Sequence, residues 1–209
     1  IDAMFLAMPA ADAVRNRRRL VSGQIRETLK AFPHRAVQVM SIGSGPAQEV
    51  LDLFEDADAR ERLRVTLLDI DAEALAHVRS CIDREHFRVA IALLEENVVR
   101  LALRRRAVDL APQDLVYSIG LMDYLSDGLV VRVLDLVYSW LAPGGRALVG
   151  NFHPRNPNRG VLDHLFGWPL IHRSEADMDR LFMRSAFAQP CTRIVFEPEG
   201  INLFAECIK

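Results

Sequence analysis

A glycine-rich turn, Gly43-Ser44-Gly45, directly follows the apolar run Val37 to Ile42. Glycines between a strand and a helix remove side chains where a nucleotide or amino-acid ligand approaches the backbone, and helix-terminal N–H groups then point at that ligand. Taken alone, such a turn also occurs for purely steric reasons. A dinucleotide-binding fingerprint would have a third glycine at position 48, where this chain has Gln48, so the pattern argues against NAD.

A carboxylate, Asp69, ends the next apolar run, Val65 to Leu68. A carboxylate at the end of a second strand can accept two hydrogen bonds from a ribose diol. Asp69 could instead cap the following helix, but Asp71 is better placed for that role. The glycine turn and Asp69 together favour a nucleoside-containing ligand.

Four polar residues lie at or just beyond the ends of two later apolar runs. Asp123 and Tyr124 follow the run 115–119, and Asn151 and His153 come at the end of the run 146–151. Ligands of open α/β sheets bind beyond the carboxyl ends of the strands, so we expect these side chains in one region. We predict Tyr124 and His153 as catalytic residues and Asp123 and Asn151 as substrate-binding residues. An imidazole takes up a proton near neutral pH, which makes His153 the strongest base candidate. Alternatively, His153 fixes a turn before Pro154, and Tyr124 lines a pocket or closes the core.

Arginines and an apolar run lie near this region in the sequence. Arg155 and Arg159, within the proline-rich stretch 153–160, could bind an acidic acceptor or face solvent. The run Trp168 to Ile171 is typical of a hydrophobic lid or of simple packing. The clusters Arg17 to Arg19 and Arg104 to Arg106 interrupt apolar helical patterns, and we interpret both as solvated helix faces.

Short apolar runs alternate with helical patterns, which is typical of a largely parallel sheet with crossover helices and predicts an α/β fold. The turn Pro198-Glu199-Gly200 is so short that its flanking strands must be antiparallel. A helix is expected to begin at Ser174, with Asp177 in capping-box position. The predicted strands are residues 37–42, 65–69, 87–93, 115–119, 146–151, 192–197 and 201–208. The helices are expected over 11–32, after the glycine turn, and around 75–82, 98–102, 126–137 and 174 onward.

The 209 residues are enough for one well-buried domain, with 1–36 as an N-terminal helical segment and 37–209 as the ligand-binding domain. A net charge of -2 gives no indication of a nucleic-acid partner. No run is long enough to span a membrane, and the first residues lack the order of a secretory signal. The three cysteines form no CxxC pair, so we expect no metal site and a cytoplasmic location.

Four segments together resemble the successive motifs of class I S-adenosylmethionine-dependent methyltransferases. Their order and spacing match, and the terminal strand pair matches the antiparallel hairpin of that family's sheet. The resemblance implies a Rossmann-like, seven-stranded, mostly parallel sheet and S-adenosyl-L-methionine as the cofactor. The segments are Val39 to Gly45, Leu67 to Asp71, Asp114 to Ser118 and Leu141 to Gly145.

The resemblance also implies a role for individual residues. The glycine turn would face the methionine part of the cofactor, Asp69 would hold the ribose, and Ile70 would pack on the adenine. Asn97 falls near the place where the family often has an Asp that contacts the adenine amine. Pro46 and Ala47 replace the third glycine of the commonest family motif. The implied cofactor-binding residues are Gly43, Ser44, Gly45, Asp69, Ile70, Asn97, Val98, Ser118 and Gly120.

Three further segments, Tyr117 to Leu125, Asn151 to Pro157 and Trp168 to Ile171, resemble a bacterial subgroup linked to methyl esters of 3-hydroxy fatty acids. This resemblance implies a small-molecule acceptor that carries a carboxylate. His153, Arg155 and Arg159 would then be binding groups.

Three other functions remain open on the sequence. A regulatory domain would bind S-adenosylmethionine without turnover. An aminopropyltransferase would want several acidic residues at the fourth strand, where Asp123 stands alone. A nicotinamide oxidoreductase is disfavoured by Gln48 and by the terminal strand pair. The sequence leaves the oligomeric state open.

Overall fold

A computed structural model describes residues 8–85, 89–104 and 106–209. Its central element is one seven-stranded sheet with the strand order β3-β2-β1-β4-β5-β7-β6. Strands β1 to β5 pair in parallel, whereas β7 is antiparallel to both β5 and β6. This arrangement confirms the predicted α/β sheet with an antiparallel pair at its end. The strands are β1 (Val37–Ile42), β2 (Leu63–Asp69), β3 (Ala90–Glu95), β4 (Gln113–Ser118), β5 (Leu141–Phe152), β6 (Arg193–Phe196) and β7 (Asn202–Ile208).

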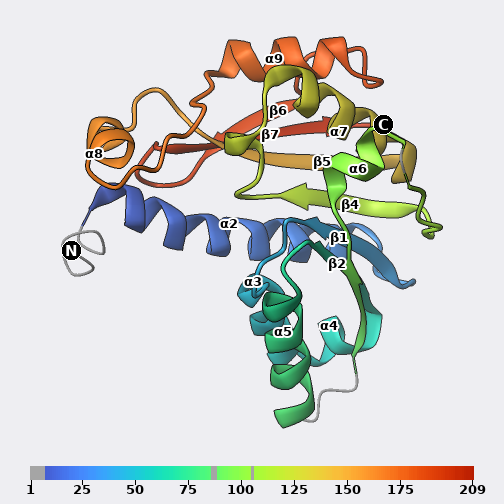
Figure 1. The fold of residues 1–209 in the computed structure, drawn as a ribbon. Coiled ribbons are helices and arrows are strands. Elements are labelled where there is room, and N and C mark those ends of the chain that lie inside the picture. The colour runs from blue at the N-terminus through green and yellow to red at the C-terminus, as the bar shows by residue number, and fades with distance from the viewer. Residues whose placement is uncertain (1–7, 86–88, 105) are drawn as a thin grey trace.

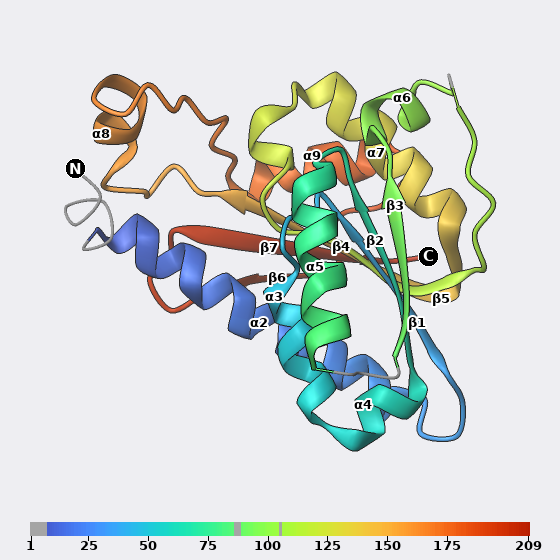
Figure 2. The ribbon, with the colours of Figure 1, turned by 60° about the horizontal axis from the view of Figure 1, so that its bottom comes forward.

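Helices cover both faces of this sheet (Figure 1). One face carries α2 (Pro9–Ala31), α3 (Gln48–Leu51), the 3-10 helix η1 (Asp52–Glu55), α4 (Ala57–Arg62) and α5 (Ala72–Arg84). The other carries α6 (Val98–Ala102), α7 (Asp127–Trp140) and α9 (Glu175–Arg184). Figures 1 and 2 show α8 (Arg159–His164) away from both layers, beside the start of α2. There the Ala10 amide donates to Asn158 Oδ1 at 3.1 Å. None of the helices in the described ranges is both long and apolar enough to cross a membrane.

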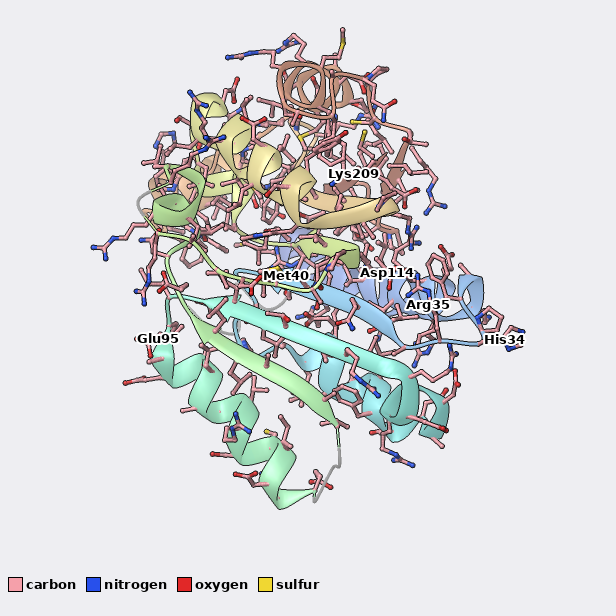
Figure 3. All side chains as sticks on the ribbon, turned by 90° about the vertical axis from the view of Figure 1, so that its right-hand side faces the viewer. His34, Arg35, Met40, Glu95, Asp114 and Lys209 are labelled. Atoms are coloured by element: carbon pink, nitrogen blue, oxygen red, sulfur yellow. The ribbon has the colours of Figure 1, made fainter. Side chains whose placement is uncertain are left out.

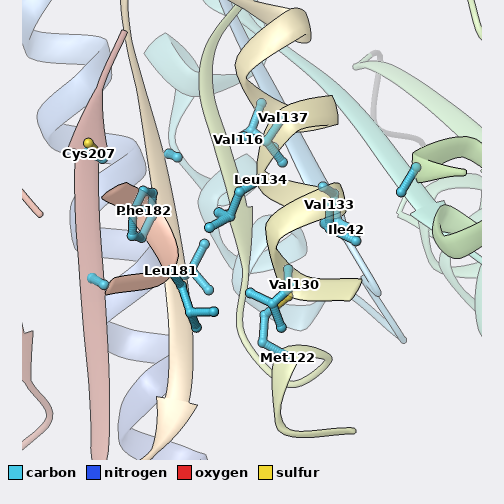
Figure 4. Close-up of a cluster of buried hydrophobic side chains, with 14 of the residues drawn as sticks. Ile42, Val116, Met122, Val130, Val133, Leu134, Val137, Leu181, Phe182 and Cys207 are labelled. Carbon is cyan, nitrogen blue, oxygen red and sulfur yellow. The ribbon is translucent and has the colours of Figure 1, made fainter. Parts of the chain in front are cut away.

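The apolar side chains of α7 show why this helix packs on the sheet. Val130, Val133, Leu134 and Val137 recur at helical spacing and are all buried. In Figure 4 they lie over the sheet, near Val116 of β4. Every residue of β4 is buried, as expected for a central parallel strand covered on both faces.

The amino-terminal edge of the sheet is closed by an ion pair between Arg35 and Asp114 (Figure 3). The Arg35 guanidinium donates to both carboxylate oxygens, at 2.8 and 2.6 Å, and the Gln38 amide donates to Asp114 Oδ2 at 2.9 Å. Bidentate pairs of this kind fix geometry as well as charge. Glu95 marks the opposite, carboxyl-terminal edge in the same view, which is the edge where ligands of such sheets bind.

Several predicted caps and boundaries are confirmed. The Asp71 side chain accepts from the amides of Glu73 and Ala74 and so caps α5. Ser174 and Asp177 form the expected capping box at α9. Helix α2 and strand β1 lie where the sequence pattern placed them.

Other boundaries differ from prediction. Strand β3 is described from Ala90 to Glu95 rather than over 87–93, and positions 87 and 88 lie outside the described residues. The helix after the glycine turn divides into α3 and η1, and α8 begins inside the proline-rich stretch 153–160, where no helix was predicted. The turn at Pro143-Gly144-Gly145 lies within β5, where the register with β4 shifts between Gln113 and Leu115. Gly144 has a φ of +77°, which allows this irregularity.

Gly145 lies where β4 and β5 approach each other too closely for a side chain. A Cβ at this position would lie 2.7 Å from the Gln113 carbonyl oxygen, which is backbone and cannot move aside cheaply. We expect Gly145→Ala to lower the free energy of unfolding by about 1–3 kcal/mol in urea titrations. Gly128→Ala is the matched control, because a Cβ there meets nothing within 4 Å and the site is helical. An equal effect of the two substitutions would contradict this account of the turn.

Candidate functional site

A cavity of about 170 Å³ lies at the carboxyl ends of β1 and β2. Five residues predicted to bind the cofactor line it: Gly43, Asp69, Ile70, Asn97 and Val98. Leu68, Glu96, Val99 and Leu121 complete the lining. A larger hollow of about 670 Å³ lies elsewhere, between α3 and α5, and contains no predicted site residue. The structure therefore brings together residues from three loops that the sequence had linked only by motif order.

Asp69 connects two of these loops. Its Oδ2 accepts a hydrogen bond from the Gly45 amide at 2.6 Å, and its Oδ1 accepts from the Asp71 amide at 2.9 Å. Each carboxylate oxygen can accept more than one hydrogen bond, so the partly exposed side chain can still bind hydroxyl donors. Asp69 therefore fixes the glycine turn and faces the cavity at once.

The glycine turn does not present its amides to the cavity. The Gly43 and Ser44 amides donate to the Leu68 carbonyl, and the Gly45 amide donates to Asp69. These three amides are therefore bonded within the protein, and the expectation for the helix-terminal N–H groups after the turn stays a prediction. Ala47, which replaces the third glycine of the family motif, has a left-handed φ of +45°. The turn thus keeps a glycine-like conformation at this residue, although a Cβ makes that conformation costly.

Ile70, Asn97 and Glu96 form another side of the cavity. Ile70 is 66% exposed and provides an apolar surface for a flat ring. Asn97 Oδ1 accepts from the Val99 and Arg100 amides and caps α6. Since this oxygen already has two donors, the Asn97 side chain can offer a ligand its Nδ2 donor rather than a second acceptor. Sequence reasoning missed Glu96, which is buried and paired with Arg106 at 2.5 Å.

Asp123 lies on the segment that follows β4, and Asn151 lies near the carboxyl end of β5. Asp123 is buried in the 3-10 helix η2 (Met122–Tyr124), and its Oδ1 accepts from the Phe152 amide at 2.6 Å. Burial raises the pKa of Asp123 to about 6, although Phe152, Arg17 and Arg173 act in the opposite direction. Asn151 donates to the Phe152 and Ile171 carbonyls and accepts from Arg173 at 2.9 Å. In this arrangement Asn151 holds the surrounding chain rather than presenting a free amide.

Arg173, which sequence reasoning missed, organises these segments. Its guanidinium is buried and donates to the Met122 and Leu125 carbonyls, to Asn151 and to Asp127. A buried guanidinium with this many acceptors joins η2, β5 and α7 in one rigid arrangement. No sequence motif marks the residue, because its acceptors are mostly backbone carbonyls.

His153 has both ring nitrogens bonded within the protein. Its Nδ1 accepts from the Arg155 amide at 3.1 Å, so Nε2 carries the proton and donates to Glu175 at 3.0 Å. The ring is buried and packs nearly perpendicular to the Phe196 ring. These contacts favour the alternative in which His153 fixes the turn at Pro154. A role as base stays a prediction and would require one of these bonds to break.

The remaining acceptor-side residues lie near the surface. Tyr124 is 52% exposed, and its hydroxyl accepts from Trp168 Nε1 at 2.7 Å, so the predicted lid run contacts η2. Arg155 Nη2 lies 3.7 Å from Glu175 Oε1, and Arg159 Nε lies 3.5 Å from Asp163 Oδ2. Both arginines therefore have carboxylate partners of their own.

Ser118 and Gly120 occupy the end of β4. The Ser118 hydroxyl is buried and donates to the Ile42 carbonyl at 2.9 Å, so it joins β4 to β1. Gly120 lies against Arg17, whose Nη2 would be 3.1 Å from a Cβ at this glycine. Arg17 thus reaches the site from α2 and is not part of a solvated helix face, which corrects the prediction for this member of the arginine cluster. The helical pattern gave no signal that one arginine of three turns inward.

Solved structures share this architecture. A structure described as a possible exported protein from Bordetella parapertussis has a TM-score of 0.75 at 20% identity, covering 97% of this chain and 70% of that one. Magnesium protoporphyrin IX methyltransferase from Synechocystis PCC 6803, with bound S-adenosylhomocysteine, has a TM-score of 0.69 at 12% identity, covering 95% and 85%. The pyocyanin biosynthetic protein PhzM has a TM-score of 0.64 at 17% identity, covering 88% of this chain and 53% of that one. The chain therefore has the Rossmann-like fold of class I methyltransferases.

No protein-family model matches the sequence, and no curated protein sequence matches it. The chain spans about half the length of several structural neighbours, including PhzM at 53%. The shared architecture defines a class of fold.

The raised pKa of Asp123 predicts a pH dependence of stability. The folded protein holds the carboxyl proton more tightly than the unfolded chain, so stability falls as pH rises from about 4 to about 6. The Asp123→Asn side chain cannot titrate. The free energy of unfolding of this variant minus that of the wild type should therefore increase by on the order of 3 kcal/mol as the pH rises across this range. Urea unfolding at several pH values measures the difference. The exposed Asp109→Asn is the control, and a pH-independent difference for Asp123→Asn would contradict the assignment.

Proposed function

We propose that this protein binds S-adenosyl-L-methionine in the cavity at β1 and β2 and transfers its methyl group to a small-molecule acceptor. The observation that carries the proposal is the meeting of Asp69, Ile70 and Asn97 around one cavity, on a fold whose neighbours include methyltransferases with the bound cofactor or its product. A carboxylate, an exposed aliphatic surface and an amide donor are the groups that a ribose and an adenine require.

Each residue suits one part of this cofactor. Asp69 can accept hydrogen bonds from the ribose hydroxyls while it holds Gly45. Ile70 can pack on the adenine, and Asn97 Nδ2 can donate to a ring nitrogen. A Cβ at Gly43 would lie 3.2 Å from the Leu121 Cβ, so a side chain there would crowd the cavity.

When bound, the cofactor supplies an electrophilic methyl group on a sulfonium. The protein must align the acceptor with this methyl group and exclude water, and it needs a base only for an acceptor that loses a proton. Arg173 positions the segments after β4 and β5 for this task. Trp168 of the predicted lid run donates a hydrogen bond to the Tyr124 hydroxyl, so this run contacts η2.

The acceptor that we propose is a carboxylate with an apolar portion, such as a hydroxy fatty acid. Apolar side chains near the lid support this proposal, since Leu165 is 66% exposed and Ile171 is 42% exposed. Asp123, Asn151, His153, Arg155 and Arg159 remain proposed contacts on this side. A carboxylate acceptor needs no base, which agrees with the full hydrogen bonding of His153.

Calorimetry with S-adenosylhomocysteine tests the cofactor site. Asp69→Ala should weaken binding by about tenfold to one hundredfold, because hydrogen bonds to a charged acceptor contribute about 1.5–3 kcal/mol. Asp71→Asn is the matched control, because it removes a neighbouring charge and keeps a capping residue on α5.

Absence of binding to the wild-type protein would refute the proposed function. Unchanged affinity in Asp69→Ala would remove the ribose assignment alone. Binding of S-adenosylmethionine without methylation of any carboxylic acid offered would favour the regulatory domain over the enzyme.

Ile70 provides an independent prediction. Ile70→Ser removes an aliphatic surface that is already exposed, so stability should change by less than about 0.5 kcal/mol. Affinity for adenosine-containing ligands should fall severalfold, because the adenine loses an apolar partner. Thermal unfolding and calorimetry on the same samples measure both effects. Ile208→Ser, another exposed aliphatic residue far along β7, should leave the affinity unchanged.

A further inference from the structure

Arg17 places a guanidinium beside the segment that follows β4. It extends from α2 to the end of β4, where the absent side chain of Gly120 leaves room for it. Within the described part of the chain it has no hydrogen bond and no ion pair. Its neighbours in the helix differ: Arg18 pairs with Asp52, and Arg19 donates to Asn16 at 3.3 Å.

The surroundings make this isolation costly. Burial lowers the pKa of Arg17, and the charges of Asp123, Tyr124 and Glu49 act against that shift. Asp123 and Glu49 influence Arg17 without forming an ion pair with it, and each already accepts a different hydrogen bond, from Phe152 and Tyr117 respectively. An arginine stays protonated in proteins, so a partly buried guanidinium without an acceptor requires an anion.

We propose that Arg17 binds the carboxylate of a ligand at the carboxyl end of β4, beside the proposed cofactor cavity. The inference rests on the proposed function and adds a residue to it. A planar guanidinium matches a carboxylate in a two-pronged pair. The nearby Asp123 and Glu49 carboxylates would repel a dianionic phosphate more strongly than a singly charged carboxylate, which favours the latter.

Two ligands can supply this carboxylate: the amino-acid portion of the cofactor or the acid of the acceptor. Arg155 and Arg159, the carboxylate partners predicted for the acceptor, are paired with Glu175 and Asp163. Arg17 is therefore the better placed cation for either source.

The first experiment compares S-adenosylhomocysteine with 5′-methylthioadenosine, which lacks the amino-acid portion, by calorimetry on wild type and Arg17→Gln. If the cofactor supplies the carboxylate, Arg17→Gln lowers the affinity for S-adenosylhomocysteine about tenfold to one hundredfold and leaves the affinity for 5′-methylthioadenosine unchanged. Arg19→Gln, an exposed change on the same helix, is the matched control and should change neither. Arg17→Lys should restore part of the affinity, because it keeps the charge without the fork.

The second experiment measures octanoate and 1-octanol on protein saturated with S-adenosylhomocysteine. If the acceptor supplies the carboxylate, the wild type prefers octanoate and Arg17→Gln loses that preference. Thermal unfolding verifies that Arg17→Gln is folded, as expected on removal of an unpaired cation.

Equal effects on both nucleosides, together with no Arg17-dependent preference for octanoate, would overturn the proposal. Failure of the wild type to bind either nucleoside would refute the proposed function instead. The octanoate comparison on the unloaded protein then still decides whether Arg17 binds a carboxylate.

Discussion

The hydrogen bond from the Gly45 amide to the Asp69 carboxylate is the contact on which the candidate site depends. It joins the turn after β1 to the end of β2, and the Asp71 amide holds the second carboxylate oxygen. The same contact orients Asp69 toward the cavity and removes an amide from the set of possible ligand donors. The glycines therefore provide space and conformation, whereas the side chains of Asp69, Ile70 and Asn97 provide the recognition chemistry.

The opposite side of the site is held by a different kind of contact. The buried guanidinium of Arg173 donates to two backbone carbonyls in and just after η2, to the Asn151 amide oxygen and to the Asp127 carboxylate. Asp123 adds a bond to the Phe152 amide, so the segments after β4 and β5 are joined twice. Polar residues that the sequence presented as candidate substrate contacts thus serve in part to build the edge at which an acceptor would bind.

Local patterns in the sequence predicted the elements whose information is itself local. The alternation of apolar runs, the short turn before β7, the Asp71 cap and the Ser174 capping box depend on residues close together along the chain. The glycine turn and Asp69 belong to successive strands of a parallel sheet, so their meeting follows from the fold class. Helix α8 and the early start of β5 were missed because their limits depend on packing and on pairing with β4.

The sequence by itself determined the class of sheet and its antiparallel end, and it pointed to Asp69, Ile70 and Asn97, three of the residues that line the cavity at β1 and β2. Only the tertiary structure decided which polar groups are already bonded and which are free. His153 is bonded to Glu175 and Asn151 to Ile171, whereas Arg17 turns inward against Gly120 and has no bonded partner among the residues that the structure describes. Hydrogen bonds between residues far apart in the chain make this distinction, and helical or strand periodicity carries no record of them.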